Sequence, residues 1–550
     1  MNRFREALEQ GKFVITCESI PGRGAGSEPS QEKAISTAEE IYATGRVDAI
    51  SITDNPGGNP AILAEGISKL LAERGVCTLT HFTCKDRNRN QILSQLYNME
   101  REGIENVLFM TGDYQVGGWK GRARPNFDLD SVQIQALCRE LNEGLEVQGR
   151  KGPINEQPTH FFAGGVVNPY KYRVGETVPQ YLKMEKKILS GARFLIMQLG
   201  YDARKTQECL KYLQMRGYNV PVIANVFVAT FVTAKLMRAG KIAGCHVSDA
   251  YLKTLEEERK SEDKGRAARV ERAAQMVAVA KGIGCAGVHI GGFGVDAGTV
   301  VHILDRAAEL EDNWRDYVIP SSFPEPKGYY FFEPELDANG KPTGLNSDTL
   351  APQTEDISGR KLFKSYRLSR FFHYWILTLD KRFNKCLARS MDKRDKKHGV
   401  NRSHRIEHTG KAFIYGCLDC GDCGLEATIY SCPMAQCPKS QRNGPCGGSM
   451  DGWCEVYPNE RYCIWYKAYH RLARYDEMWR IESFITPPNN WDYYETSAWS
   501  NYTHRRDNAA HRVFVSLGQD GAPGGKVKSE DKTDAPPDAD ASDAAKGQAS

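Results

Sequence analysis

Eight of the 16 cysteines in this 550-residue chain fall within one short segment. They are Cys417, Cys420, Cys423, Cys432, Cys437, Cys446, Cys454 and Cys463. A CxxCxxC triplet followed by a more distant Cys-Pro pair is typical of iron-sulfur ligation, because three thiolates on a tight loop can bind one side of a cluster and a remote fourth can complete it. The last four cysteines could form a tetrahedral zinc site or a second cluster. The segment predicts metal binding rather than disulfides.

A second set of polar side chains stands at the ends of β-rich runs. It comprises Glu18 in CESIP, Thr53 after SI, His81 and Thr83 in THFTC, Asp113 in TGD and Gln198 in IMQ. Taken singly, each is a common turn or structural residue. On successive strands of a parallel barrel, however, they would converge on one cavity. An acid, a candidate base and several hydrogen-bond donors would then meet in that cavity.

The elements that must position these residues alternate along residues 13–311, where short β-rich runs are separated by stretches of helical period. The runs are FVITCESI, DAISITD, CTLTHFT, ENVLFMTG, HFFAGGVV, FLIMQLG, VPVIANVF and GVHIGGF. Between the first two lies a helix over residues 30–45, which Ser30 can cap and Gly45 can end. An eightfold βα repeat over about 300 residues predicts an α/β chain with a (βα)8 TIM barrel.

A doubly wound open sheet is the alternative arrangement. Near-continuous apolar strands such as NVLFM and FLIM fit burial on both faces in either fold. The dinucleotide fingerprint GxGxxG, expected directly after the first strand of a doubly wound sheet, is missing, since GRGAG follows a proline there. This difference favours the barrel.

Composition changes along the chain predict four parts. Residues 1–312 form the barrel, and residues 313–362, rich in Pro, Gly, Asp and Asn, form a linker. Residues 363–510 form a smaller, cysteine-rich, mostly helical metal-binding domain. Residues 511–550 have almost no large apolar side chains, which predicts a disordered tail.

Charge and hydropathy exclude several classes of protein. Lys plus Arg number 73 against 69 for Asp plus Glu, so no strong field favours nucleic acid or an anionic membrane. The amino terminus lacks a secretory signal, and no run approaches the roughly 20 apolar residues of a membrane span. The nearest run, FFHYWILTL at residues 371–379, is better explained as a buried helix. We expect a cytoplasmic protein.

Residues 12–310 resemble the methylenetetrahydrofolate reductases, which are flavin-dependent barrels of one-carbon metabolism. The resemblance is carried by CESIP, SIT, THFTC, the GD pair after strand four, KKILSGARFLIMQ and NVFVATF. No single piece is specific, but all six occur in order on the expected strands.

The resemblance implies a role for each site residue. Glu18 would be the general acid that opens the methylene bridge of the folate to an iminium, and Asp113 would lie beside the flavin ring. The remaining contacts would be Thr53, His81 and Thr83 with the flavin, Lys187 with its phosphates, and Gln198 and Phe231 with the folate. The implied cofactor is FAD.

Several positions depart from the family pattern. Thr111 stands where relatives often have arginine, and Gly164 and Gly165 stand where an aromatic residue is expected. Lys183 and Glu185 change the polar pattern near Lys187. FMN in place of FAD therefore stays open.

The cysteine segment resembles the carboxy-terminal or small-subunit domain that accompanies some bacterial methylenetetrahydrofolate reductases, notably in GPCGG at residues 444–448. The resemblance covers residues 363–500. It implies electron delivery or assembly with other redox subunits. A [4Fe-4S] cluster here would imply electron flow, and zinc would imply a structural role. The electron donor would be NAD(P)H or a protein, and the chain would form an oligomer or a complex with redox subunits.

Three functions follow as hypotheses. The first is an oxidoreductase that interconverts 5,10-methylenetetrahydrofolate and 5-methyltetrahydrofolate. The second is a non-catalytic folate-binding or electron-transfer subunit, against which Glu18 and Asp113 argue. The third is the same chemistry run toward oxidation, and no feature of the chain distinguishes the direction.

Overall fold

Eight parallel strands close into a barrel, as the sequence predicts. The computed structural model describes residues 2–26, 28–363, 366–373, 402–482 and 484–514. The barrel strands are β1 (Val14–Ser19), β2 (Ala49–Ile52), β3 (Thr78–Thr83), β4 (Asn106–Met110), β7 (Phe162–Val167), β8 (Phe194–Met197), β9 (Val222–Val228) and β10 (Gly287–Gly292). Their order around the barrel is β1-β10-β9-β8-β7-β4-β3-β2. The closed order rules out the open doubly wound sheet.

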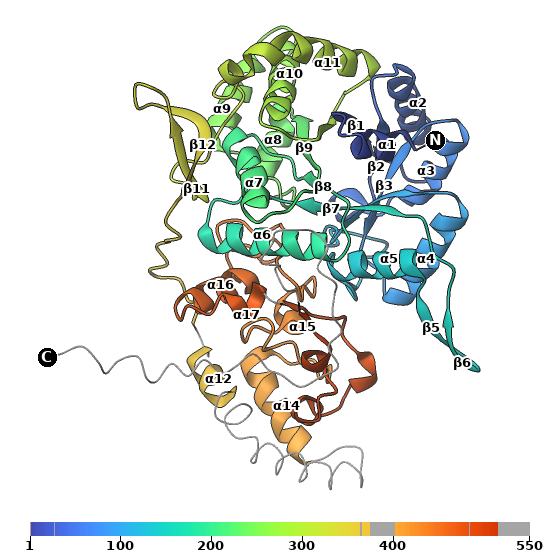
Figure 1. Ribbon diagram of the computed structural model, residues 1–550, viewed down its shortest axis with the longest axis vertical. Helices are drawn as coiled ribbons and strands as arrows, with labels where there is room; N and C mark the ends of the chain where they lie inside the picture. The colour runs from blue at the N-terminus through green and yellow to red at the C-terminus, as the bar shows by residue number, and fades with distance from the viewer. Residues whose placement is uncertain (1, 27, 364–365, 374–401, 483, 515–550) are drawn as a thin grey trace, which may run out of the picture.

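Helices cover the barrel on the outside (Figure 1). They are α2 (Pro29–Ala43), α3 (Ala64–Glu73), α4 (Arg89–Arg101), α5 (Gln133–Glu143), α6 (Val174–Leu189), α7 (Ala203–Met215), α8 (Phe231–Arg238), α9 (Asp249–Glu258), α10 (Arg266–Gly282) and α11 (Ala297–Leu310). A hairpin of β5 (Glu146–Gly149) and β6 (Gly152–Asn155) projects from the barrel between α5 and β7.

The alternation of side chains along the strands decides which residues face the barrel interior. At the amino ends of the strands the interior is apolar and includes Val14, Ala49 and Leu79. Helix α1 (Arg3–Glu9) closes this end, because fully buried Phe4 packs edge-on against Phe194 with ring centroids 5.1 Å apart. Farther along β1, β2 and β3 the interior positions are polar, so the opposite, carboxyl end is the face available for chemistry.

The start of α2 differs from the prediction. Glu28 is the N-cap residue and Pro29 is the first helical residue, so Ser30 lies inside the helix and no side chain caps it. The fixed φ of proline suits the first helical position, which explains the earlier start. Gly45, with φ +71°, follows the last turn as predicted.

The segment predicted as a linker contains regular structure that packs on the barrel. It includes the 3-10 helix η2 (Glu311–Tyr317) and an antiparallel hairpin of β11 (Phe332–Leu336) and β12 (Pro342–Leu350), which packs on α7. The Phe331 N–H donates to Glu208 at 2.7 Å, and the Tyr330 hydroxyl donates to Asp202 at 2.6 Å. These contacts fix the hairpin to the barrel.

The carboxy-terminal region is mostly helical, as predicted. Its elements are α12 (Tyr366–Phe372), α14 (Arg402–Tyr415), α15 (Pro433–Gln436), α16 (Ile464–Ala473), α17 (Trp479–Glu482), α18 (Ala498–Thr503), short 3-10 turns and the strand pair β13 (Phe484–Ile485) with β14 (Val513–Phe514). Helix α16 lies along α6 (Figure 1), and Tyr181 and Leu182 share one hydrophobic cluster with Trp465 and Leu472. The two parts of the chain therefore share a core.

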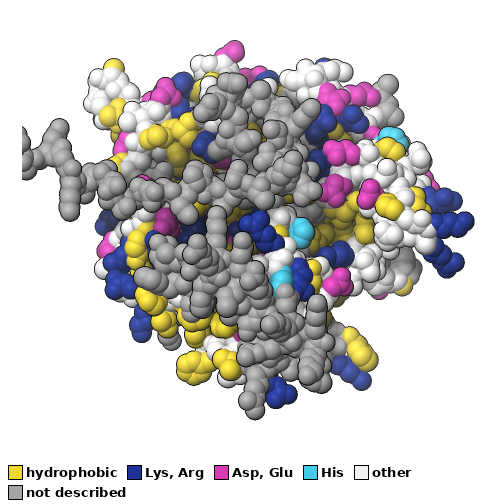
Figure 2. Space-filling view, turned by 60° about the horizontal axis from the view of Figure 1, so that its bottom comes forward, with side chains coloured by type: hydrophobic (Ala, Val, Ile, Leu, Met, Phe, Trp, Pro, Cys, Tyr) yellow, Lys and Arg dark blue, Asp and Glu magenta, His cyan; other side chains and the backbone are white. Residues whose placement is uncertain are grey.

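Two sequence predictions fall partly outside the described residues. Of the predicted tail, residues 513–514 form β14 and residues 515–550 lie outside; of the run at 371–379, residues 374–379 lie outside. None of the helices that the structure describes has the length and apolar character needed to span a bilayer. On the face shown in Figure 2, the visible described residues mix basic, acidic and hydrophobic side chains, in line with the small net charge.

A buried ion pair anchors α7, and it gives a stability prediction. Lys205 and Glu208 are both fully buried, and the Lys205 Nζ lies 2.8 Å from the Glu208 Oε1. We expect Lys205→Met to lower the free energy of unfolding by about 3–5 kcal/mol, because it leaves the Glu208 charge uncompensated. Urea denaturation measures the difference. The control is Lys260→Met, which breaks the exposed Lys260–Glu257 pair and should leave the curve unchanged. Equal curves for all three proteins would contradict the account.

Candidate active site at the carboxyl ends of the barrel strands

Glu18 stands near the carboxyl end of β1 with its carboxylate in the barrel interior. A Cβ at Gly291 on β10 would lie 2.8 Å from the Glu18 Oε2, so the glycine makes room for the carboxylate. No hydrogen bond from another described residue reaches this carboxylate. Burial raises the pKa of Glu18 to about 7. A carboxyl group that titrates near neutral pH suits proton donation.

Asp113 follows β4 and faces the same space. Its Oδ2 accepts a hydrogen bond from the Gly57 N–H at 2.9 Å. Burial raises the pKa of Asp113, and the Lys439 ammonium opposes that rise. Burial raises the pKa of the Cys245 thiol, and the charges of Asp113 and Glu18 raise it further. The two carboxylates therefore lie around one site at the barrel mouth, by which we mean the carboxyl ends of the eight strands and the loops that follow them.

Among the buried polar atoms near the mouth that have no hydrogen-bond partner in the described residues are the Thr53 Oγ1, just after β2, and the Asn225 Oδ1 on β9. Strand alternation directs both side chains into the barrel. Buried polar groups are nearly always hydrogen-bonded, so these two atoms are available to hydrogen-bond a ligand at the mouth.

Thr83 and His81 are engaged with protein neighbours. The Thr83 hydroxyl donates to Asp54 at 2.9 Å, and the Arg87 guanidinium binds the same carboxylate at 2.6 Å. His81 lies deeper, with its Nε2 2.6 Å from the Ser51 Oγ. Burial lowers the pKa of His81 to about 3, so its imidazole is neutral at physiological pH.

The other predicted contacts lie at different depths. Gln198 follows β8 at the mouth and lies against Gly244: a Cβ added to that glycine would be 3.3 Å from the Gln198 Nε2. Phe231 begins α8, and the Arg259 guanidinium lies 4.4 Å from its ring centroid. Lys187 is buried between α6 and the barrel wall, where its Nζ donates to the Val166 carbonyl and burial lowers its pKa to about 7. The structure thus brings Gln198 to the mouth and puts Lys187 behind β7.

The positions that depart from the family pattern have structural explanations. A side chain at Gly164 would clash with the Phe194 ring, and one at Gly165 would meet Lys187. The Thr111 hydroxyl donates to the Gln441 Oε1 at 3.2 Å, and the Lys183 Nζ donates to the same oxygen at 2.6 Å. Thr111 and Lys183 therefore bind the carboxy-terminal region, which packs against the barrel here.

A cavity of about 470 Å³ opens beside the mouth, between the barrel loops and residues 448–451. Tyr170, Lys171, Cys245 and His246 contribute to its lining. This volume suits a small organic ligand. Sequence reasoning missed these loop residues, because no motif marks them and their contacts are distant along the chain.

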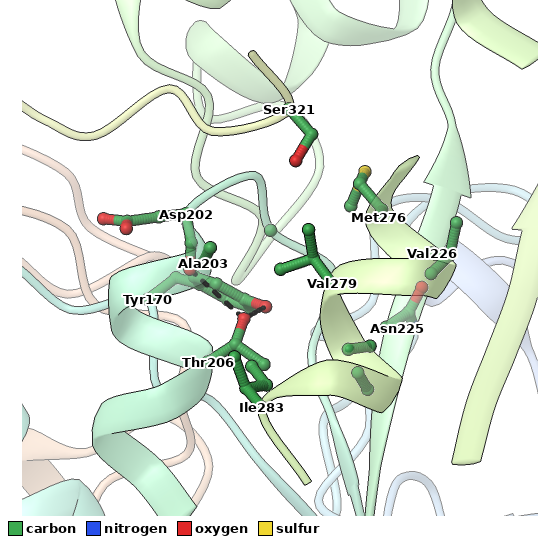
Figure 3. A pocket seen from close by; sticks show the side chains of 13 residues that line it. Tyr170, Asp202, Ala203, Thr206, Asn225, Val226, Met276, Val279, Ile283 and Ser321 are labelled. Carbon is green, nitrogen blue, oxygen red and sulfur yellow. Dashed lines mark hydrogen bonds between the residues drawn. The ribbon is translucent and has the colours of Figure 1, made fainter. Parts of the chain in front are cut away.

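A second cavity lies outside the barrel wall, among β9, α7 and α10 (Figure 3). The Tyr170 hydroxyl and the Thr206 hydroxyl lie 3.0 Å apart on one side of it. At about 30 Å³ it has room for little more than water. It is too small for a folate.

The eight clustered cysteines form two sets, and within each set the charges of neighbouring thiols raise one another's pKa. The first cysteine group is Cys417, Cys420, Cys423 and Cys432, and the second cysteine group is Cys437, Cys446, Cys454 and Cys463. Within the described part of the chain, however, no three Cys, His, Asp or Glu side chains are arranged to hold a metal ion.

Burial raises the pKa of Cys417, Cys420 and Cys432 in the first cysteine group, and a few polar contacts oppose that rise. Backbone N–H groups donate to the sulfurs of Cys417 and Cys432, each at 3.4 Å. The Lys411 ammonium lies 3.8 Å from the Cys423 sulfur. Burial raises the pKa of Cys432 to about 12, so a metal or another cation would be needed to hold the thiolates together. The donor chemistry fits a soft metal.

Fold and site together define a (βα)8 barrel with two carboxylates of raised pKa at its mouth, joined to a helical domain rich in cysteine. The family model described as methylenetetrahydrofolate reductase matches residues 3–306, and one described as the carboxy terminus of methylene-tetrahydrofolate reductase matches residues 398–492. The chain belongs to the methylenetetrahydrofolate reductase family.

Curated relatives match the barrel part of the chain. Methylenetetrahydrofolate reductase (NADH) 1 of Arabidopsis thaliana is 23% identical over 245 residues, which is 44% of this chain and 39% of the relative. Methylenetetrahydrofolate reductase 1 of Schizosaccharomyces pombe is 21% identical over 277 residues, or 50% of this chain and 43% of the relative. The chain thus spans less than half the length of both relatives.

Two solved structures show weaker likeness. An uncharacterized protein from Clostridium thermocellum that binds two copies of 5-methyl-5,6,7,8-tetrahydrofolic acid has TM-score 0.39 and 14% identity over 56% of this chain and 98% of its own. A dihydropteroate synthase of Coxiella burnetii in complex with pteroic acid has TM-score 0.30 and 11% identity over 55% of this chain and 94% of its own. Both scores are low, and the barrel assignment depends on the observed strand order.

Proposed function

We propose that the protein is a flavin-dependent oxidoreductase that interconverts 5,10-methylenetetrahydrofolate and 5-methyltetrahydrofolate. Glu18 carries the proposal: a half-buried carboxyl with a pKa of about 7, and with no hydrogen-bond partner among the described residues, stands at the mouth of a barrel of this family. A subunit that only binds folate would have no need for an acid poised in this way. The family membership and the folate named in the relatives' activity support the substrate class.

In this proposal Glu18 acts as the general acid. It donates its proton to the folate nitrogen that leaves as one C–N bond of the methylene bridge breaks, which produces the iminium. Asp113 would lie near the cationic intermediate, where the Lys439 ammonium favours its carboxylate form against the effect of burial. Gln198 and Phe231 would orient the folate; both lie on the carboxyl side of the barrel. A bound flavin supplies the hydride.

The cofactor would sit over the polar interior of the barrel. Thr53 and Asn225, whose polar atoms lack a partner among the described residues, would hydrogen-bond the flavin, and Thr83 and His81 would also contact it. Lys187 could reach phosphates only if its Nζ left the Val166 carbonyl. FAD is proposed, with FMN as the alternative. Releasing the cofactor by denaturation and identifying it by chromatography tests this assignment, and a protein that cannot be loaded with any flavin would contradict it.

The two cysteine groups are proposed as metal sites that deliver electrons or support assembly. The first cysteine group is proposed to hold a [4Fe-4S] cluster, and the second to hold zinc or another cluster. The electron donor is then NAD(P)H or a redox protein. This part of the proposal rests on the two groups of four thiols and on the N–H···S contacts of the first group.

The raised pKa of Glu18 sets an expected pH dependence. A proton donor must be protonated, so the rate of methylenetetrahydrofolate reduction should be level below pH 7 and fall about tenfold per pH unit above it. Single-turnover oxidation of the reduced protein by the folate, followed across pH, measures this. The Glu18→Gln variant should give a slow, flat profile as the control. A break between pH 4 and 5, as for an ordinary carboxyl, would contradict the assignment.

A further inference from the structure

We propose that Lys439, supplied by the carboxy-terminal region, is a positioning residue of the barrel site that fixes the turn carrying Asp113 and balances its charge. The cysteine-rich region would then also complete the folate site, in addition to holding metal. The inference deepens the proposed function and rests on it.

The turn that carries Asp113 is held directly from the carboxy-terminal region. The Lys439 Nζ donates to the Gly112 carbonyl at 2.7 Å, one residue before Asp113. Gly112 has φ +85°, and a Cβ there would lie 2.8 Å from the Thr83 side chain, so this backbone conformation needs glycine. Two residues after Lys439, Gln441 accepts a hydrogen bond from the Thr111 hydroxyl at 3.2 Å. Two side chains of one segment thus hold consecutive residues of this turn.

The charge of Lys439 is buried beside the site. Its side chain is 4% exposed and forms an ion pair with Glu455, which is 8% exposed. Both charges act on Asp113, with Lys439 favouring and Glu455 disfavouring the carboxylate. Burying an ammonium costs several kcal/mol unless its partners compensate. An interface that needed only adhesion could use an apolar side chain here, so the buried cation next to Asp113 indicates an electrostatic role.

The same ion pair reaches the second cysteine group. The Cys446 thiol lies 3.6 Å from the Glu455 Oε1. Polar contacts therefore run from Cys446 through Glu455 and Lys439 to the turn of Asp113. A change of charge at the second cysteine group would alter the electrostatic potential at the barrel mouth through these contacts.

The test compares Lys439→Met with Lys439→Arg in the full-length, flavin-loaded protein. The readouts are the midpoint potential of the flavin and the separate values of kcat and KM for the folate. We expect Lys439→Met to lower the potential, because loss of a nearby positive charge destabilises the reduced, more anionic flavin. It should also reduce kcat by about tenfold to a hundredfold with a smaller change in KM. Lys439→Arg keeps the positive charge and should therefore retain most of the wild-type potential and kcat.

The matched control is Arg89→Met. The Arg89 guanidinium also crosses from the barrel to the carboxy-terminal region, where it donates to the Asn489 carbonyl at 2.7 Å, but its ion pair is with Asp128 rather than with a carboxylate of the mouth. It should leave the potential unchanged. If wild type holds flavin and reduces folate, yet Lys439→Met shifts the potential and kcat no more than Arg89→Met does, Lys439 is only an interface residue. If wild type itself lacks flavin and folate turnover, the proposed function fails and this inference fails with it.

Discussion

Replacing Glu18 by glutamine is expected to abolish most folate turnover while the flavin is still reduced by its donor. Glutamine keeps the size and polarity of the side chain beside Gly291 but cannot donate an acidic proton. Loss of a general acid costs about two to four orders of magnitude in rate. Stopped-flow measurement of the two half-reactions, one with the electron donor and one with 5,10-methylenetetrahydrofolate, separates the effects.

The design has an internal control, because the donor half-reaction needs no protonation of the folate. A matched external control is Glu32→Gln, an exposed carboxylate in the first turn of α2, which should leave both half-reactions at the wild-type rate. Wild-type rates for both half-reactions in Glu18→Gln would show that Glu18 is not the acid.

The second large effect is expected at the cysteine groups. Serine cannot replace a thiolate ligand of a soft metal, and structural zinc in zinc-finger peptides contributes about 10–16 kcal/mol to folding. Cys420→Ser should therefore lose the metal of the first cysteine group and keep that of the second, whereas Cys446→Ser should show the reverse. Because Cys446 contacts Glu455, which pairs with Lys439, Cys446→Ser should also disturb the flavin, and Cys420→Ser should leave it in place.

Elemental analysis for iron and zinc in anaerobically prepared protein, together with the visible spectrum, measures these outcomes. Cys77→Ser is the control, since Cys77 is a half-buried barrel cysteine outside both groups, and its metal content should equal that of wild type. Zinc without iron in wild type would remove the cluster from the proposal. Neither metal in wild type would remove both metal sites.

The barrel itself could be predicted because its pattern is local. Each strand is an apolar run bounded by turn residues, and the eight strands of the barrel fall within the eight predicted runs to within one residue. Glu18 and Asp113 could be placed for the same reason, because the carboxyl ends of the barrel strands and the loops that follow them form the mouth. The prediction that Ser30 caps α2 is wrong. The helix begins one residue earlier, at Pro29, whose fixed φ suits the first helical position.

What could not be predicted depends on contacts between distant segments. The prediction of a linker misses the Phe331–Glu208 and Tyr330–Asp202 hydrogen bonds, which hold that segment on α7. In the sequence, Thr111 differs from the arginine common in relatives, a difference that bears on the flavin contacts. In the structure its hydroxyl donates to Gln441, 330 residues away in the chain. Lys439 lies among the cysteines and carries no motif of its own, so its place beside Asp113 emerges only when the two regions pack together.

The central claim is that this barrel passes a hydride between a bound flavin and a folate one-carbon unit. The most direct measurement mixes the anaerobically reduced protein with 5,10-methylenetetrahydrofolate, follows the flavin absorption band and quantifies the folate product. The account predicts that the oxidised band returns while 5-methyltetrahydrofolate forms in an amount equal to the flavin. A protein that binds no flavin, or a reduced flavin that stays bleached with the folate unchanged, would contradict it.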